Sequence, residues 1–277
     1  MNYWTQLSCE FAQQRNYLDE LYRIYPIISN LRREISENKI GKIKSAFDLR
    51  ENSKLIKELL GLKLFPVKDS YVAFLKCDKT AIERNPNTVN RIAGNLYQLG
   101  FEQIIDNCTQ PKESNRQMGP MFKRWIDGGA LGARIIKDEE EFLNCNENCI
   151  LNIGDTAMKN FAERYLGYRR DKGLDFIARF NGIYVIAEAK FITDFGGHQT
   201  GQFDDAVNTL QSTFEEKIVE NQVIAISIMD GVIYIKNKRK FYKYLKENPD
   251  KIILSALFFK EIFFFFYFFF FFFFFFF

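Results

Sequence analysis

Histidine is almost absent from this chain of 277 residues, in which His198 is the only one. Catalytic zinc sites usually draw on several histidines, and hydrolytic triads pair a serine with a histidine that carries its proton. With a single histidine, metal clusters built on histidine and Ser-His triads of the usual kind are nearly excluded. Two large classes of catalytic site are thereby set aside.

Cysteine is also scarce. The five cysteines are odd in number and scattered, and the N-terminus carries no secretory signal, so we expect a reducing cytoplasm. Cys145 and Cys149 make a poor zinc pair, because no second Cys/His pair accompanies them. The formal net charge is only +3, so a surface that binds nucleic acid must be local and not a global basic field.

The C-terminal end lacks variety. From Ile262 to Phe277 the residues are phenylalanine apart from Ile262 and Tyr267. The run is shorter than the roughly 20 residues that span a bilayer, and it lacks the mixed aliphatic composition of natural spans. Thymine-rich codons encode phenylalanine, so a homopolymer DNA tract would generate it. We therefore treat 261–277 as a low-complexity tail and predict that truncation after Lys260 is tolerated; a membrane anchor is the alternative.

The most informative stretch is Gly173–Lys190, GLDFIARFNGIYVIAEAK, which is typical of a β-hairpin. Two runs rich in β-branched and aromatic residues flank Asn181-Gly182, the strongest short signal for a two-residue type I′ turn. Such a turn fixes the register, with Phe180 opposite Ile183. Because side chains alternate between the faces of a strand, one face is expected to be wholly apolar: Leu174, Phe176, Ala178, Phe180, Ile183, Val185, Ala187 and Ala189.

The other face of this hairpin carries charge. The register places Asp175 directly opposite Glu188, and two opposed carboxylates repel each other. Lys190 on the same face offsets part of that charge, and a divalent cation would offset the rest. Mg²⁺ is typically held by one or two carboxylates plus phosphate oxygens, and a metal beside an ammonium suits phosphodiester hydrolysis. A surface salt bridge on a half-exposed hairpin is the alternative.

Asp175 followed by Glu188-Ala189-Lys190 resembles the D…ExK signature of the PD-(D/E)xK nuclease superfamily, and in particular its type II restriction endonucleases. The next segment, FITDFGGHQTGQFDDAVNTL, strengthens the likeness, because the ExK strand runs into a Gly-rich loop and then a helix. The resemblance covers about residues 155–236. Leu174 stands where the family name has proline, which many members also lack.

This resemblance implies an α/β fold, with a restriction-endonuclease-like core at 133–260 whose mixed central sheet is flanked by helices. Asp175 and Glu188 would bind Mg²⁺ and, with Lys190, form the catalytic set. Related nucleases often place a further glutamate on the helix before the hairpin, and Glu163 is the candidate here, with a solvated glutamate as the alternative. The implied partners are double-stranded DNA, a second copy in a homodimer and a cognate DNA methyltransferase.

The rest of the chain is expected to supply recognition. Residues 1–132 are expected to form a mainly helical region that serves DNA recognition, with a basic loop and a short helix after Thr109. The candidate DNA contacts in this segment are Arg116, Gln117, Lys123 and Arg124, for which a plain surface loop is the alternative. His198 and Gln199, after Lys190, are further binding candidates, and a structural role is the alternative for the histidine. The patterns predict helices at 2–25, 27–60, 87–99, 155–166 and 204–217, and strands at 71–76, 134–137, 222–228 and 232–236.

Three other functions remain open from the sequence. The first is a structure-specific repair or junction nuclease built on the same core. The second is a DNA-binding protein without cleavage activity, against which the intact set of Asp175, Glu188 and Lys190 argues. The third is a membrane-anchored protein, for which the phenylalanine tail is the sole argument. We favour the type II restriction endonuclease, since large helical additions to this core commonly carry site recognition.

Overall fold

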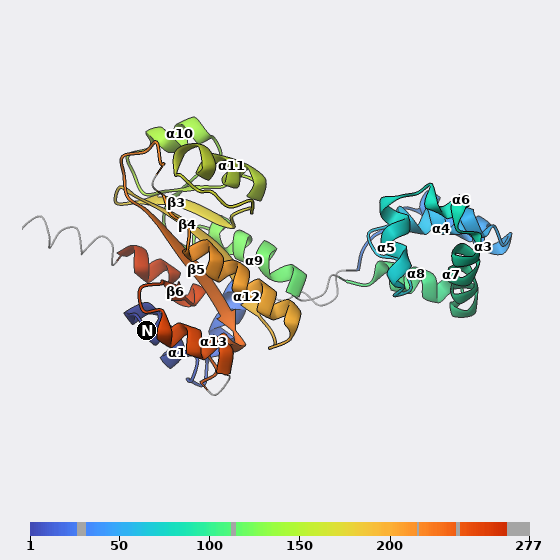
Figure 1. Ribbon diagram of the computed structural model, residues 1–277, viewed down its shortest axis with the longest axis horizontal. Helices are drawn as coiled ribbons and strands as arrows, with labels where there is room; N and C mark the ends of the chain where they lie inside the picture. Colours follow the sequence, from blue (N-terminus) through green and yellow to red (C-terminus); the bar gives the residue numbers. More distant parts are fainter. Residues whose placement is uncertain (27–31, 112–114, 215, 237–238, 265–277) are drawn as a thin grey trace, which may run out of the picture. The chain divides into compact units, whose positions relative to one another are not determined.

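The chain folds into two compact units (Figure 1). The computed structural model describes residues 1–26, 32–111, 115–214, 216–236 and 239–264, without the side chains of 115, 116 and 239. One unit, the sheet unit, combines Met1–Ile27 with Ser114–Phe277, and the other, the helical unit, is Ile28–Glu113. This division differs from the predicted boundary at residue 132, because the N-terminal helices and the helix at 115–127 share a hydrophobic core with the sheet.

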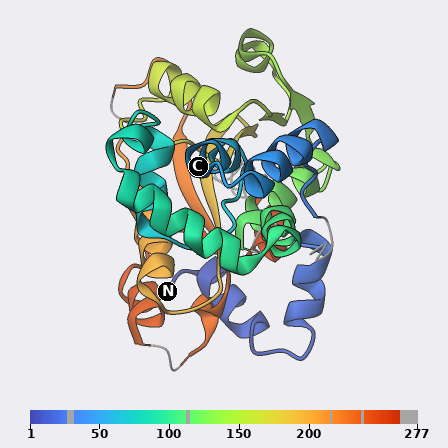
Figure 2. The same ribbon diagram turned by 90° about the vertical axis from the view of Figure 1, so that its right-hand side faces the viewer.

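The helical unit contains helices only, within its described residues, and has a core of its own (blue and teal in Figure 2). Its core is built from residues at helical spacing, such as Ile92 and Leu96 on one helix and Leu55 and Leu59 on another. Its helices are α3 (Glu37–Asp48), α4 (Asn52–Leu60), α5 (Ser70–Cys77), α6 (Ala81–Arg84), α7 (Pro86–Leu99) and α8 (Phe101–Thr109).

The strand predicted at 71–76 is wrong, because this segment is helix α5. Asp69 caps it by accepting a hydrogen bond from the Tyr71 backbone N–H at 2.9 Å. Val72 and Leu75, three residues apart, are its buried positions, which is the helical period. A short apolar run does not distinguish a strand from a buried helix by composition, and here the capping residue and the spacing decide.

The sheet unit is built around a mixed six-stranded sheet in the order β1-β2-β3-β4-β5-β6. Strands β2, β3 and β4 are antiparallel neighbours, whereas β1 pairs with β2, β4 with β5 and β5 with β6 in parallel. The strands are β1 (Arg134–Ile136), β2 (Cys149–Leu151), β3 (Phe176–Phe180), β4 (Ile183–Ile192), β5 (Val223–Gly231) and β6 (Ile253–Leu254). The α/β class and the mixed sheet predicted from the sequence are confirmed.

Helices cover both faces of this sheet (Figure 1). The predicted helix at 2–25 is divided into α1 and α2, and the helix predicted at 204–217 begins earlier and ends by Leu210. The helices of the unit are α1 (Tyr3–Phe11), α2 (Tyr17–Ile24), α9 (Asn115–Asp127), α10 (Glu139–Asn144), α11 (Asp155–Tyr165), α12 (Gly197–Leu210) and α13 (Arg239–Glu247), with short 3₁₀ turns at Val232–Tyr234 and Ala256–Phe258.

The predicted hairpin is β3 and β4, and its register is the expected one. Phe180 pairs with Ile183, and the pairing continues to Phe176 opposite Ala187. Asn181 and Gly182 have φ values of 50° and 79°, the left-handed conformations that a type I′ turn requires. The apolar face of the hairpin from Phe176 to Ala189 is buried, as predicted, in the core that also includes α9 and the C-terminal segment. Leu174, predicted on the same face, is buried instead in the core on the other side of the sheet.

The strand predicted at 232–236 is wrong, because Val232–Tyr234 is a 3₁₀ turn, and β5 has β4 and β6 as parallel neighbours. Asp230 is fully buried and accepts hydrogen bonds from the Tyr25 hydroxyl at 2.9 Å and from the Ala256 N–H at 3.2 Å. Burial raises the pKa of Asp230 to about 6, although its hydrogen bonds act in the opposite direction. This carboxyl therefore joins α2, β5 and the turn at 256–258.

The start of the phenylalanine run belongs to the core, contrary to the predicted boundary at residue 261. Residues 259–264 are helical, and Ile262 and Phe263 are buried. The Phe263 ring stacks on Phe180 of β3, with 3.8 Å between ring centroids and 13° between planes. Residues 265–277, which include the rest of the tail, lie outside the described residues. Within the described part of the chain, no helix is long and apolar enough to cross a membrane.

Candidate active site

Asp175, Glu188 and Lys190 come together on one face of the sheet. Asp175 directly precedes β3, and its backbone N–H donates to the Ala187 carbonyl at 3.2 Å, which extends the hairpin by one step. Glu188 and Lys190 lie two residues apart on β4 and therefore share a face. The register places Glu188 beside Ser227 of β5, so Glu188 lies on a central strand of the sheet.

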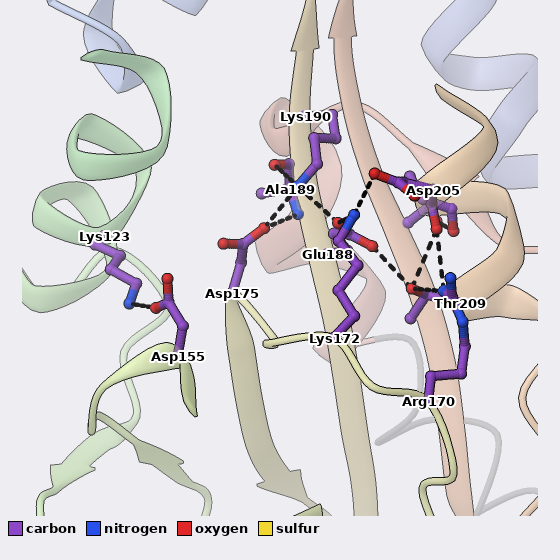
Figure 3. Close-up of polar contacts among 12 residues, drawn as sticks. Lys123, Asp155, Arg170, Lys172, Asp175, Glu188, Ala189, Lys190, Asp205 and Thr209 are labelled. Atoms are coloured by element: carbon purple, nitrogen blue, oxygen red, sulfur yellow. Dashed lines mark hydrogen bonds and ion pairs between the residues drawn. The ribbon is translucent and has the colours of Figure 1, made fainter. Parts of the chain in front are cut away.

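The Lys190 ammonium is the centre of the cluster (Figure 3). Its Nζ lies 3.2 Å from Asp175 Oδ2, 2.8 Å from Glu188 Oε1 and 3.3 Å from the main-chain oxygen of Ala189. Asp175 Oδ2 also accepts the Ala189 N–H at 3.0 Å. The two carboxylates that the sequence placed face to face are therefore joined by one cation.

Glu188 is the most deeply buried of the three, with a side chain that is 1% exposed, against 23% for Asp175 and 20% for Lys190. Its Oε2 accepts a hydrogen bond from the Thr209 hydroxyl of α12 at 2.8 Å. Its Oε1 is buried and has no hydrogen-bond partner, although two ammonium groups lie close to it. One oxygen of Glu188 is therefore held by α12, and the other faces two ammonium groups.

The protonation states follow from these contacts. Burial opposes the charged form of Glu188, but the charge and close approach of Lys190, the Thr209 hydroxyl and the charge of Lys172 together lower its pKa. Burial likewise opposes the ammonium form of Lys190, but the charges of Asp175 and Glu188 outweigh it and raise the pKa of Lys190. At neutral pH the cluster holds a carboxylate and an ammonium.

The oxygens around Lys190 fit a divalent cation. Among the described residues, no group of three or more His, Cys, Asp or Glu side chains could hold a metal ion. The donors here are two carboxylates and the main-chain oxygen of Ala189, which already surround one positive charge. Mg²⁺ suits hard oxygen donors that leave positions for water and phosphate, and Oε1 of Glu188, which has two ammonium groups beside it, is one such donor.

Basic residues before β3 complete the cluster, and sequence reasoning missed the most important of them. Lys172 Nζ lies 3.1 Å from Glu188 Oε1 and also pairs with Asp205 of α12. Arg170 donates to the Thr209 hydroxyl at 2.7 Å. In the sequence, the only indication of these contacts of Arg170 and Lys172 is the spacing of their partners Asp205 and Thr209, which lie four residues apart on one face of a helix.

Lys123, a predicted DNA contact, lies near the site from the opposite side (Figure 3). It projects from α9 and forms an ion pair with Asp155, the first residue of α11. Lys123 and Asp175 line the same cavity of about 10 Å³, together with Asn152 and Asp127. A cavity this small has no room for more than one water molecule, and α9 itself packs against β4.

The other predicted residues have different surroundings. Arg124 is exposed on α9, and Gln117 is half-buried there, while the side chain of Arg116 lies outside the described residues. His198 is exposed in the first turn of α12, within 3.3 Å of the Gln202 amide nitrogen. Gln199 is buried, and its side-chain oxygen accepts the Thr193 N–H at 3.3 Å, which suits support of the loop after β4.

Glu163, the candidate for a further glutamate, is not part of the cluster. Its carboxylate lies 3.5 Å from Lys159 one turn earlier on α11, and Lys159 also pairs with Asp171. The residue is partly exposed. This geometry favours the solvated glutamate that the sequence left as the alternative.

Comparison with known proteins gives one family. The protein-family model described as the Tsp45I type II restriction enzyme matches residues 2–266, nearly the whole chain and both units. Comparisons with curated proteins and with solved structures gave no match. The match to the family includes Ile262 and Phe263, which agrees with their place in the core.

Proposed function

The chain belongs to the family of the Tsp45I type II restriction enzyme and is therefore a site-specific deoxyribonuclease, and we propose that Asp175, Glu188 and Lys190 form its cleavage site. The observation that carries this proposal is the Lys190 ammonium, which lies within 3.3 Å of oxygens from Asp175, Glu188 and Ala189. Enzymes of this class generally use a divalent metal, and we propose Mg²⁺ here because every donor is a hard oxygen.

Each residue has a distinct role in this proposal. The carboxylates of Asp175 and Glu188 and the Ala189 carbonyl would hold the cation. The cation, when bound, lowers the pKa of a water molecule and stabilises negative charge on the phosphate. Lys190 stays charged because both carboxylates raise its pKa, so it positions the attacking water by hydrogen bonding and stabilises the additional charge of the transition state.

We further propose that the helical unit contributes to recognition. Residues 28–113 contain 15 Lys and Arg against 11 Asp and Glu, whereas the whole chain has a net charge of only +3. The helical unit therefore carries the basic excess of the protein, which suits contact with DNA phosphates. Of the predicted DNA contacts in the sheet unit, we favour Arg124 and His198, because their side chains are exposed.

The partners that we propose follow from the reaction. A single cleavage site cuts one strand, and a two-fold symmetric homodimer would place a second site on the other strand. A nuclease that cuts a recurring sequence would also cut its host genome, so a cognate DNA methyltransferase that protects this sequence, in the same cytoplasm, is the expected functional partner.

Digestion of methylation-free phage DNA tests the proposed function. With Mg²⁺ we expect discrete fragments whose ends share one sequence, and with EDTA we expect intact DNA. The same DNA treated with the cognate methyltransferase is the matched control and should resist cleavage. Cutting at junctions or damaged sites without a shared sequence would instead indicate a repair nuclease, and cleavage in EDTA would contradict the metal requirement.

A further inference from the structure

Glu188 is contacted by a second lysine that lies outside the D…ExK pattern (Figure 3). Lys172 Nζ lies 3.1 Å from the same Oε1 that Lys190 approaches to 2.8 Å. This oxygen is buried and has no hydrogen-bond partner, so the two ammonium groups act on it through their charge. Lys172 is therefore placed to influence whatever Glu188 binds.

The position of Lys172 is fixed by its neighbours. Its ammonium also pairs with the carboxylate of Asp205 on α12. One turn later on that helix, Thr209 donates to Glu188 Oε2 and accepts a hydrogen bond from Arg170. Arg170 also donates to the Asp205 carbonyl at 3.2 Å. Two cations of one short segment thus hold two successive turns of α12 against Glu188.

The backbone next to Lys172 is also closely packed. Gly173 lies against Asp155, and a Cβ added to this glycine would lie 3.1 Å from the Cβ of Asp155. A larger residue would push the segment away from α11. The close approach that glycine permits therefore helps to keep Lys172 directed at Glu188.

We propose that Lys172 is a positioning residue of the cleavage site, which acts through Glu188 and weakens the binding of the divalent cation. This inference rests on the proposed role of Glu188 as a cation ligand. In the cation-free protein, the ammonium groups of Lys172 and Lys190 balance the carboxylates of Glu188 and Asp175. An entering divalent cation meets the like charge of Lys172, which Asp205 prevents from moving away.

This arrangement gives Lys172 two opposite effects. It keeps the Glu188 carboxylate in one orientation, which favours the reaction, and it reduces the affinity for the cation. A residue that only stabilised the fold would not tighten cation binding when it is removed. The two effects can therefore be separated by measuring cation binding and cleavage on the same variant.

The test uses the full-length protein with Lys172→Met. By titration calorimetry of cation-free protein with Mg²⁺, we expect the Kd to fall by about threefold or more, because a like charge has been removed. At saturating Mg²⁺ we expect single-turnover cleavage to slow by roughly 10- to 100-fold, the scale for disturbing a group behind a metal ligand. Lys172→Arg should restore both values toward those of the wild type.

Lys159→Met is the matched control, because Lys159 is also a partly buried lysine with two carboxylate partners, Glu163 and Asp171. It should change neither the Mg²⁺ affinity nor the rate. Unchanged or weaker Mg²⁺ binding by Lys172→Met, or a wild-type rate, would overturn the inference. If Lys172→Met does not fold, Asp205→Asn replaces it, because Lys172 can then move away from Glu188. Tighter Mg²⁺ binding with a slower reaction supports the inference, and unchanged or weaker Mg²⁺ binding or a wild-type rate overturns it.

The proposed function is tested separately by Glu188→Gln. If this variant binds Mg²⁺ as the wild type does, the role of Glu188 as a cation ligand fails, and the inference about Lys172 fails with it. If Glu188→Gln loses Mg²⁺ binding while Lys172→Met behaves as the wild type does, only the inference about Lys172 fails.

Discussion

Asp175→Asn and Glu188→Gln are each expected to abolish DNA cleavage while leaving a folded protein. Each change keeps the size of the side chain but removes the negative charge that would hold the cation. The expected loss in single-turnover rate is on the order of 10⁴-fold or more, as for removal of one member of a group that acts as a unit. DNA binding without Mg²⁺ should persist or strengthen, because a negative charge near the phosphate is gone.

Glu163→Gln is the matched control for these variants. Glu163 is a carboxylate of the same unit, and it pairs with Lys159 on α11 at 3.5 Å and takes no part in the cluster. This variant should cleave at a rate close to that of the wild type. Near-wild-type, Mg²⁺-dependent cleavage by folded Asp175→Asn or Glu188→Gln protein would remove these residues from the active site, and a thermal melt of each variant verifies the fold.

Phe263→Ala is expected to cause the largest loss of stability. Its ring is 4% exposed and packs between Phe180 of β3 and Phe259, with centroids 3.8 Å and 4.8 Å away. Truncation of a buried phenylalanine to alanine typically costs about 3–5 kcal/mol of unfolding free energy. Urea denaturation measures this loss.

Truncation after Lys260, which the sequence alone suggested would be tolerated, should destabilise the protein for the same reason.

Phe264→Ala is the control for this prediction, because its ring is 57% exposed although it is the next residue in the same run. We expect its free energy of unfolding to stay within about 0.5 kcal/mol of the wild-type value. Equal effects of the two substitutions would show that Phe263 is not a core residue. Because Phe263 packs near the turn of the hairpin, folded Phe263→Ala protein should still cleave DNA at low temperature.

The centre of the site could be predicted because its geometry is local. Asn181-Gly182 fixes the turn, and the alternation of side chains then places Asp175, Glu188 and Lys190 on one face. Nothing beyond this hairpin is required to bring the three together. The period of two along each strand also predicts which face of the hairpin is apolar. It does not show that Ile177, Tyr184 and Ile186 on the opposite face are buried as well.

The surroundings of the site could not be predicted, because they depend on contacts between distant segments. Lys172, which lies outside both strands of the hairpin, contacts Glu188 through the fold of the segment before β3. Thr209 contacts Glu188 because α12 packs on β4. The burial of Phe263 could not be predicted for a different reason, because a run of one residue type has no periodicity that shows where its buried part ends. The buried position of Asp230 also depends on a distant contact, because the hydroxyl of Tyr25, 205 positions away in sequence, donates to it.

Single-turnover cleavage of a cognate duplex by Lys190→Ala is the measurement that tests the cleavage site most directly, because Lys190 joins both carboxylates. We expect the rate at saturating Mg²⁺ to fall by several orders of magnitude, with ~4 kcal/mol as the scale for one preorganised electrostatic group. The affinity for the duplex should change little. An unchanged rate, beside a melting shift that corresponds to at most about 1 kcal/mol, would mean that Lys190 forms only a salt bridge, and would contradict the assignment of this hairpin as the nuclease site.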